Sequence, residues 1–136
     1  MPLSPQCISN ARDNRAMDGL VLFAHGARDT RWREPFDRLE AKARAARPDI
    51  AITLAFLELM KPNLDLAVED LAARGCTAIR VVPVFLGQGG HVREDLPAAL
   101  VRVRERHPRI AIELRQAVGE DEGVLERIAA VAVEGL

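Results

Sequence analysis

The sequence predicts one α/β domain built on a parallel four-stranded sheet with helices on both faces. Short apolar runs alternate with longer segments in which apolar residues recur at steps of three and four, the spacing of one helix face. Helical segments of that length join parallel strands through right-handed crossovers. Because such crossovers place helices above and below the sheet, the order βαβαβαβα indicates a doubly wound fold.

The first two strands and the helix between them have clear signals. Leu20–Ala24 is a continuous apolar run, as expected for a strand that is buried on both faces. Asp29 or Thr30 can cap the helix that follows, because both side chains can accept a hydrogen bond from a free amide of the first turn. Ile50–Leu57 is the second strand. The helix between these strands has an apolar stripe at Trp32, Phe36, Leu39, Ala43 and Ala46.

The second half of the chain repeats this alternation. Asn63 can cap the next helix, and Ala78–Leu86 is the third strand, in which Pro83 lacks the amide that a ladder needs. A glycine-rich loop at 87–91 precedes another helix, and Ile110–Leu114 is the fourth strand. The stripes of the three helices are Leu64, Ala67, Val68 and Leu71, then Leu96, Leu100 and Val103, then Val124, Ile128 and Val131.

The strand order decides where a ligand would bind. We expect the flavodoxin-like order 2-1-3-4, in which a crevice opens between the carboxyl ends of the first and third strands. Residues 1–17 show no periodicity and are expected to form a mobile arm, so that residues 18–136 make up the domain. Met17 stands at this boundary and is a candidate translation start.

Composition excludes several classes of function. The chain has 136 residues, of which 49% are hydrophobic and 29% charged, and its net charge of −1 gives no overall positive field for nucleic acid or an acidic membrane. Its two cysteines cannot build a disulfide framework or a metal cluster. The longest apolar run, 128–133, is far shorter than the ~20 residues of a membrane span, and no secretory signal pattern is present. We therefore expect a cytoplasmic protein.

Two of the three histidines fall at the predicted crevice. His25 directly follows the first strand, and His91 lies in the loop that leaves the third strand. Glu58 follows the second strand, which neighbours the first in the expected order. Two imidazoles and a carboxylate would thus share one edge of the sheet, a ligand set suited to cobalt, nickel, iron or zinc. Taken alone, a histidine at a strand end is more often a loop hydrogen-bonding residue than a ligand, and Glu58 alone could be a solvated strand end. His107 is best explained by the helix dipole.

The glycine-rich loop and nearby arginines suggest what else this edge could bind. Glycines at 87, 89 and 90 could cradle a phosphate, although the loop has neither the GxGxxG nor the Walker pattern. They could instead let the backbone approach a flat ligand. Arginines bind carboxylates through paired hydrogen bonds, so a polycarboxylate ligand is plausible here, while solvated helix starts explain any one of them as simply. The arginines that follow the two histidines are Arg28, Arg31, Arg33 and Arg93.

At these residues the sequence resembles the small class II tetrapyrrole chelatases of the CbiX/SirB type. The similarity covers about residues 18–100, with Ala27 in place of a frequent Ser and without the usual Pro in 116–119. The segments that carry it are Leu22-Phe23-Ala24-His25-Gly26-Ala27-Arg28-Asp29, Phe56-Leu57-Glu58 with Pro62, Val82-Pro83-Val84-Phe85-Leu86 with Gly90-His91, and Asp95-Leu96-Pro97.

The resemblance implies a lyase that inserts cobalt, iron or nickel into sirohydrochlorin, in cobalamin, siroheme or related porphyrin biosynthesis. His25 and His91 would handle the metal, which is a substrate, with Glu58 as the acidic partner, and no organic cofactor is implied. Long members of the family contain two such units, so a single unit is expected to pair as a homodimer around a shared cleft. The tetrapyrrole rim would include Arg28, Arg31, Arg93, Gly89 and Gly90.

Two other functions stay open at this point. A non-catalytic module that binds a metal or a tetrapyrrole would use the same residues without turnover. A flavodoxin-like nucleotide binder would use the glycine-rich loop, and phosphate would compete for it. The predicted nitrogen and oxygen ligands take iron, cobalt and nickel alike, so the residues do not select the metal.

Overall fold

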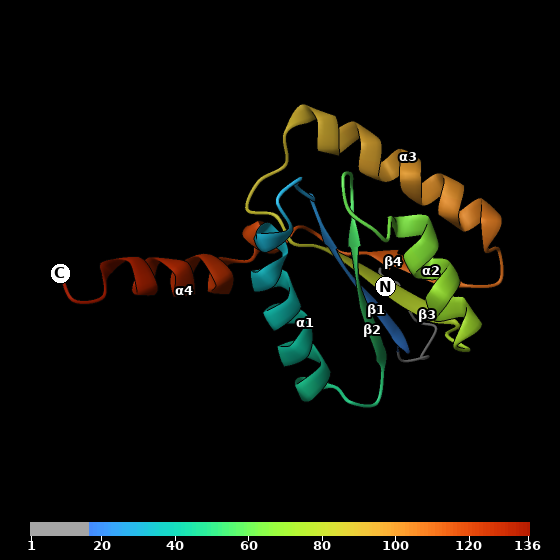
Figure 1. Ribbon diagram of the computed structural model, residues 1–136, viewed down its shortest axis with the longest axis horizontal. Coiled ribbons are helices and arrows are strands. Elements are labelled where there is room, and N and C mark those ends of the chain that lie inside the picture. The colour runs from blue at the N-terminus through green and yellow to red at the C-terminus, as the bar shows by residue number, and fades with distance from the viewer. Residues whose placement is uncertain (1–16) are drawn as a thin grey trace.

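The computed structural model describes residues 17–136, with Gly90 and His91 placed by their backbone alone. A parallel four-stranded sheet has the order β2-β1-β3-β4, which confirms the predicted topology. In Figure 1, α1 lies on one face of this sheet and α2 and α3 on the other. The expected arm lies outside the described residues, apart from Met17. The elements are β1 Gly19–Ala24, η1 Thr30–Arg33, α1 Glu34–Ala46, β2 Ala51–Phe56, α2 Leu64–Ala73, β3 Ala78–Pro83, α3 Gly90–Arg106, β4 Ala111–Leu114, η2 Val118–Glu120 and α4 Glu122–Val133.

The third strand ends earlier than predicted, and the helix after it begins earlier. The strand ends at Pro83, and Val84 N donates a last hydrogen bond to Phe23 O at 2.7 Å before the chain leaves the sheet. Helix α3 already begins at Gly90, because Gly89 adopts the extended cap conformation and Arg93 N donates to its carbonyl. His91 therefore lies in the first turn of a helix, and its placement in a loop was wrong.

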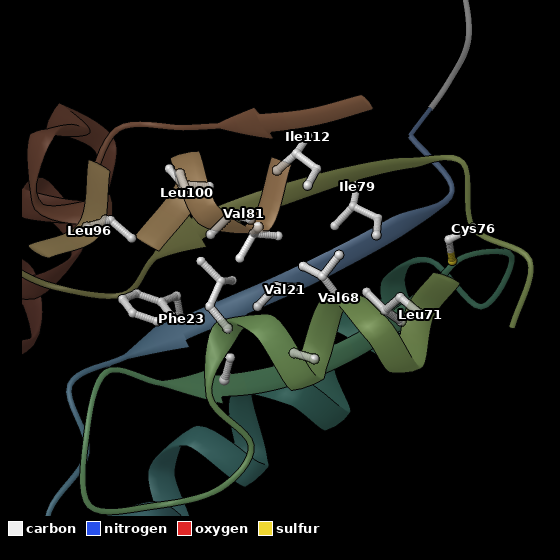
Figure 2. Close-up of a cluster of buried hydrophobic side chains, with 14 of the residues drawn as sticks. Val21, Phe23, Val68, Leu71, Cys76, Ile79, Val81, Leu96, Leu100 and Ile112 are labelled. Atoms are coloured by element: carbon white, nitrogen blue, oxygen red, sulfur yellow. The ribbon is translucent and has the colours of Figure 1, made fainter. Parts of the chain in front are cut away.

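The larger part of the core fills the space between the sheet and helices α2 and α3. Strand residues of one parity, such as Val21 and Val81, point toward this side, as expected for a pleated strand. Asn63 caps α2 as predicted, since its side chain accepts a hydrogen bond from Leu66 N at 2.9 Å. Figure 2 shows this cluster, which includes Val21, Phe23, Val68, Leu71, Ile79, Val81, Leu96, Leu100 and Ile112.

Helix α1 covers only part of the opposite face. The ring of Trp32 packs on Phe36, with centroids 4.5 Å apart, and on Phe56 of β2 at 6.4 Å. Asp29 caps η1, which precedes α1, by accepting a hydrogen bond from Arg31 N. Together these contacts hold α1 over β1 and β2, and the contacts between α1 and the sheet are made mainly with β2.

Helix α4 differs from the expectation that every helix covers the sheet. No residue of α4 is buried, and Figure 1 shows it projecting away from the sheet. Two residues of its predicted stripe, Ile128 and Val131, are exposed. A groove of about 730 Å³ lies along β3, β4 and the start of α4, and Arg80, Val82 and Leu114 line it. Within residues 17–136, no helix is long and apolar enough to cross a membrane.

Candidate metal site

The ends of β1 and β2 bring His25 and Glu58 together. The two strands pair in parallel up to Ala24 and Phe56. The ladder continues beyond them, because Leu57 N donates to Ala24 O at 2.9 Å and Glu58 N donates to His25 O at 3.2 Å. The side chains then lie side by side, with His25 Nε2 3.8 Å from Glu58 Oε2. The sequence prediction that these two residues share one edge of the sheet agrees with this geometry.

Gly26 makes this close approach possible. Its φ of +97° is a backbone conformation that favours glycine, and a Cβ at this position would lie 1.9 Å from Glu58 O. The residue after the histidine therefore packs directly against the backbone of the glutamate. The His-Gly pair in the sequence thus has a structural explanation, since any side chain at Gly26 would push the two strand ends apart.

The imidazole of His25 also contacts the aromatic core. Its ring meets Phe85 edge to face, with centroids 6.4 Å apart and an interplanar angle of 72°. Phe85 in turn packs against the buried Phe23 at 6.0 Å. The side chains of His25 and Glu58 are still 47% and 44% exposed, so solvent and a ligand can reach both. The pair therefore packs on aromatic side chains on one side and is open to solvent on the other.

The pair can supply one nitrogen and one oxygen ligand to a divalent ion. Among the side chains that the structure describes, no group of three or more His, Cys, Asp or Glu residues is placed to hold a metal. His91, the predicted third ligand, enters at the start of α3, where its backbone alone is described. Two ligands at an exposed edge leave coordination positions open for water or a substrate.

The arginines after His25 have different environments. Arg31 forms two hydrogen bonds to the Asp29 carboxylate, at 3.1 and 2.7 Å, and they lower the pKa of Asp29. Arg33 bonds to Asp37 and to Lys61 O, and its guanidinium lies 5.1 Å from the centre of the Phe56 ring. Arg28 lies exposed on the loop after β1. Arg31 and Arg33 thus have structural partners of their own.

Arg93 lines the same pocket as Arg115, an arginine that was not predicted as a site residue. Arg93 and Arg115 both line an open pocket of about 400 Å³, together with Gln88 and Gln116. Arg115 directly follows β4, so its position after the carboxyl end of a strand was the signal that could have found it. A Cβ at Gly89 would meet nothing within 4 Å, so packing does not require glycine there and the space beside it is open.

Comparison with known proteins shows relatives of this chain. The sirohydrochlorin ferrochelatase of Priestia megaterium is 30% identical over 121 residues, which are 87% of this chain and 43% of that protein. The sirohydrochlorin cobaltochelatase of Sulfolobus acidocaldarius is 27% identical over 88% of this chain and 97% of that protein. The chain spans only 29% to 43% of three longer relatives from Bacillus subtilis and Priestia megaterium.

Solved structures show the same fold. A Marinobacter aquaeolei protein assigned to cobalamin biosynthesis as a CbiX protein superimposes with a TM-score of 0.75 and 34% identity, over 85% of this chain and 94% of that one. The sirohydrochlorin chelatase SirB of Bacillus subtilis in complex with cobalt gives a TM-score of 0.74 and 25% identity, over 84% of this chain and 49% of that one. The CbiX family model matches residues 19–134. With nearly the whole described domain matched, this chain belongs to the CbiX family.

Proposed function

We propose that this chain is a lyase that inserts cobalt or iron, with nickel as a further substrate, into sirohydrochlorin without an organic cofactor. The observation that carries the proposal is the exposed pair His25–Glu58, held 3.8 Å apart at the carboxyl edge of the sheet. The relatives named as sirohydrochlorin chelatases support the same reaction. We place the protein in the cytoplasm and its reaction in cobalamin or siroheme biosynthesis.

The pair fits the chemistry of metal insertion. An imidazole nitrogen and a carboxylate oxygen can hold the ion while its remaining positions stay open to the ring nitrogens of the macrocycle. Insertion replaces two pyrrole protons by one divalent ion, so two protons must leave. Glu58 and His25 can each accept one of them as they give up the ion to the macrocycle. Because two ligands hold the ion less tightly than a closed four-ligand site, it can be transferred to the macrocycle.

We assign the remaining site residues by their positions. His91 would add a second imidazole from the first turn of α3, and Arg28 and Arg93 would bind carboxylates of the macrocycle. Arg31 would first have to release Asp29, so its contribution is expected to be smaller. Gly89 and Gly90 would let the macrocycle approach the start of α3.

The proposed enzyme is a homodimer in which each copy supplies one wall of the cleft. This chain covers about half of the SirB chain, so a second copy would supply the missing half. Helix α4 offers a way to join the copies, since its apolar residues Leu125, Ile128 and Val131 are exposed. A 12-residue helix without packing is marginal in water. We propose that it docks in the groove along β3 and β4 of the second copy.

The dimer can be tested by light scattering at micromolar concentration. Two chains of 15.0 kDa each should scatter as one particle of twice that mass. The double variant Ile128→Asp/Val131→Asp should be monomeric, because it places charges on the stripe. Val101→Asp is the matched control, since Val101 is a similarly exposed valine on α3. A wild-type monomer that still metallates sirohydrochlorin would contradict the dimer and leave the activity standing.

The activity is tested by the loss of free sirohydrochlorin absorbance after metal is added, corrected for the spontaneous reaction. His25→Ala and His91→Ala should each lower the rate by about 100-fold, the scale on which positioned acid–base groups act. Glu58→Gln should lower the rate and change its pH profile, because an amide cannot accept the proton. Equal rates for wild type and the His25→Ala/His91→Ala double variant would refute the assignment, and tight binding of metal or macrocycle without turnover would favour a non-catalytic binding module.

A further inference from the structure

The backbone at Leu59, next to Glu58, is strained. Leu59 has a φ of +67°, and within residues 17–136 it is the only residue other than glycine with a positive φ. Met60 N donates to Glu58 O at 2.8 Å, so Leu59 is the central residue of a γ-turn with positive φ, which is rare and unfavourable for a residue with a Cβ. Such outliers persist only when the surroundings enforce them, and they cluster where ligands bind.

The surroundings of this turn do enforce it. On one side, the Glu58 amide is bonded to His25 O, and the Glu58 carbonyl lies against Gly26. On the other side, Phe56 N donates to Pro62 O at 2.9 Å and closes the loop. The chain therefore holds Leu59 at its apex, where the side chain is 58% exposed instead of buried. Glycine or asparagine would fit this backbone with less strain, so the apolar side chain calls for another explanation.

A second exposed leucine occupies the matching position on the other side of His25. Leu59 lies three residues after the end of β2, and Leu86 lies three residues after the end of β3. β1, which ends just before His25, lies between these two strands in the sheet. Leu86 is 63% exposed, although the backbone beneath it is fixed, because Gly119 N donates to Phe85 O and Gly119 packs against Leu86 O.

Leu59 and Leu86 thus follow the strands on either side of β1, at the sheet edge where His25 and Glu58 lie. Strands β2 and β3 are two strand spacings apart, about 9.5 Å. A flat conjugated macrocycle has an apolar face, and it would gain from resting on apolar side chains while its centre meets the ion. Carboxylates at its periphery would reach outward to cations such as Arg28 and Arg93.

We infer that Leu59 and Leu86 are positioning residues on which the face of the tetrapyrrole rests, on either side of His25. This inference rests on the proposed chelatase function. The macrocycle loses water from its face when it lies on both leucines, and the ring nitrogens are then presented to the ion held by His25 and Glu58. The γ-turn keeps the Leu59 side chain exposed at this edge, although its backbone is strained.

The test measures binding of metal-free sirohydrochlorin by its absorbance change, and separately kcat and KM for cobalt insertion. Leu59→Asn, Leu59→Gly and Leu86→Asn should each raise the Kd and KM for sirohydrochlorin about 10-fold, as expected for loss of a buried leucine contact. The kcat and the KM for cobalt should change less than 2-fold, since the lost contact binds the ground state and the transition state alike. Leu59→Met and Leu86→Met should restore Kd to within about 2-fold.

The melting temperature distinguishes a positioning role of Leu59 from a role in stabilising the fold. Leu59→Gly and Leu59→Asn should melt at or above the wild-type temperature, because both residues tolerate positive φ. Leu66→Asn, at a similarly exposed leucine on α2, is the control and should bind sirohydrochlorin like wild type.

Three outcomes would overturn the inference. Wild-type affinity in all three Leu59 and Leu86 variants of an active enzyme would refute the positioning role and leave the chelatase standing. Dissociation of the variants into monomers would identify the leucines as an interface between copies. A wild-type protein that neither binds nor metallates sirohydrochlorin would refute the proposed function itself.

Discussion

The two ends of the parallel sheet are built in opposite ways. At the amino end, the Asp18 carboxylate accepts hydrogen bonds from Thr77 N, Thr77 Oγ1 and Ala78 N, at 2.9 to 3.1 Å. At the carboxyl end, His25 and Glu58 are about half exposed, and Leu59 has a strained backbone. The hydrogen-bonded carboxylate of Asp18 thus lies at one end of the sheet, and the exposed groups of the candidate site lie at the other.

The electrostatics of Asp18 support this division. Burial opposes the charged form of this carboxyl, but hydrogen bonds from Ala78 and Thr77 outweigh burial and lower its pKa. The nearby Cys76 is buried, and its thiol pKa is raised, chiefly by burial and by the charge of Asp18. A thiol with a raised pKa is unreactive at neutral pH. We therefore expect changes at the amino end to alter stability and changes at the carboxyl end to alter activity.

The largest effect is expected at Gly26, which lies at the carboxyl end but should affect both stability and activity. Gly26→Ala would place a methyl group 1.9 Å from Glu58 O at a φ of +97°. We expect a loss of about 3 kcal/mol in the free energy of unfolding, together with loss of metal insertion, because the two strand ends must separate. Urea denaturation measures the first effect and the absorbance assay the second. Gly87→Ala is the control, since a Cβ there meets nothing within 4 Å, and an equal loss in both variants would refute the steric cause.

Asp18→Asn should reduce stability with little change in metal insertion. Removing a charged acceptor of several hydrogen bonds should cost about 2 kcal/mol at pH 7. Because the folded pKa lies below the unfolded value of 3.8, this contribution is present above pH 3.8 and is lost as the pH falls through the folded pKa. The difference between variant and wild type in urea denaturation should therefore shrink in acid. A difference that grows below pH 3.8 would contradict the assignment.

Asp49→Asn is the natural comparison for Asp18→Asn. The hydrogen bond from Arg47 lowers the pKa of Asp49 to about 2, but this pair is exposed on the surface. Solvent screens such a pair, so we expect a much smaller loss of stability than for Asp18, despite the strongly shifted pKa. Equal losses would show that the larger number of hydrogen bonds to Asp18 does not matter.

His107→Ala should have a smaller effect on stability. His107 lies at the end of α3, far along the chain from His25. His107 is the C-terminal cap residue of α3, and its Nε2 lies 3.9 Å from Asp65 Oδ1. We expect a loss of about 1 kcal/mol, from the helix dipole and this ion pair, and unchanged metal insertion. Thermal denaturation measures the loss of stability, and the absorbance assay measures metal insertion. A rate as low as that of His25→Ala would place His107 in the site.

The smallest effect is expected for a chain that starts at Met17. Residues 1–16 have no periodic apolar pattern, so we expect the melting temperature to stay within a few degrees of that of the full chain. A larger shift in thermal denaturation would show that these residues pack on the domain or on a second copy.

Much of this architecture was predictable because it depends on patterns that repeat along the chain. The apolar runs and stripes predicted the four strands, and the flavodoxin-like arrangement common for such a repeat predicted their order. Parallel strands then bring His25 and Glu58 to one edge. The structure adds that Gly26 fits against Glu58 O. This contact joins residues far apart in sequence, so local pattern could not reveal it.

Other features depended on competition between local and distant contacts. The start of α3 at Gly90 follows from the cap conformation of Gly89, whereas composition favoured a loop there. The γ-turn at Leu59 contradicts the conformational preference of leucine, so sequence could not predict it. The stripe of α4 was visible in the sequence, but α4 projects away from the sheet and none of its residues is buried.

The contact between Gly119 and the loop after β3 has a thermodynamic consequence. Gly119 N donates to Phe85 O, and the ring of Phe85 packs on His25. Phe85 therefore connects the segment that leads to α4 with the candidate site. If α4 docks on a second copy, assembly and ligand binding act on the same loop. Linkage then requires reciprocity. If dimer formation raises the affinity for sirohydrochlorin by some factor, bound sirohydrochlorin must strengthen the dimer by the same factor. The dimer should then persist to lower protein concentration when its substrate is bound.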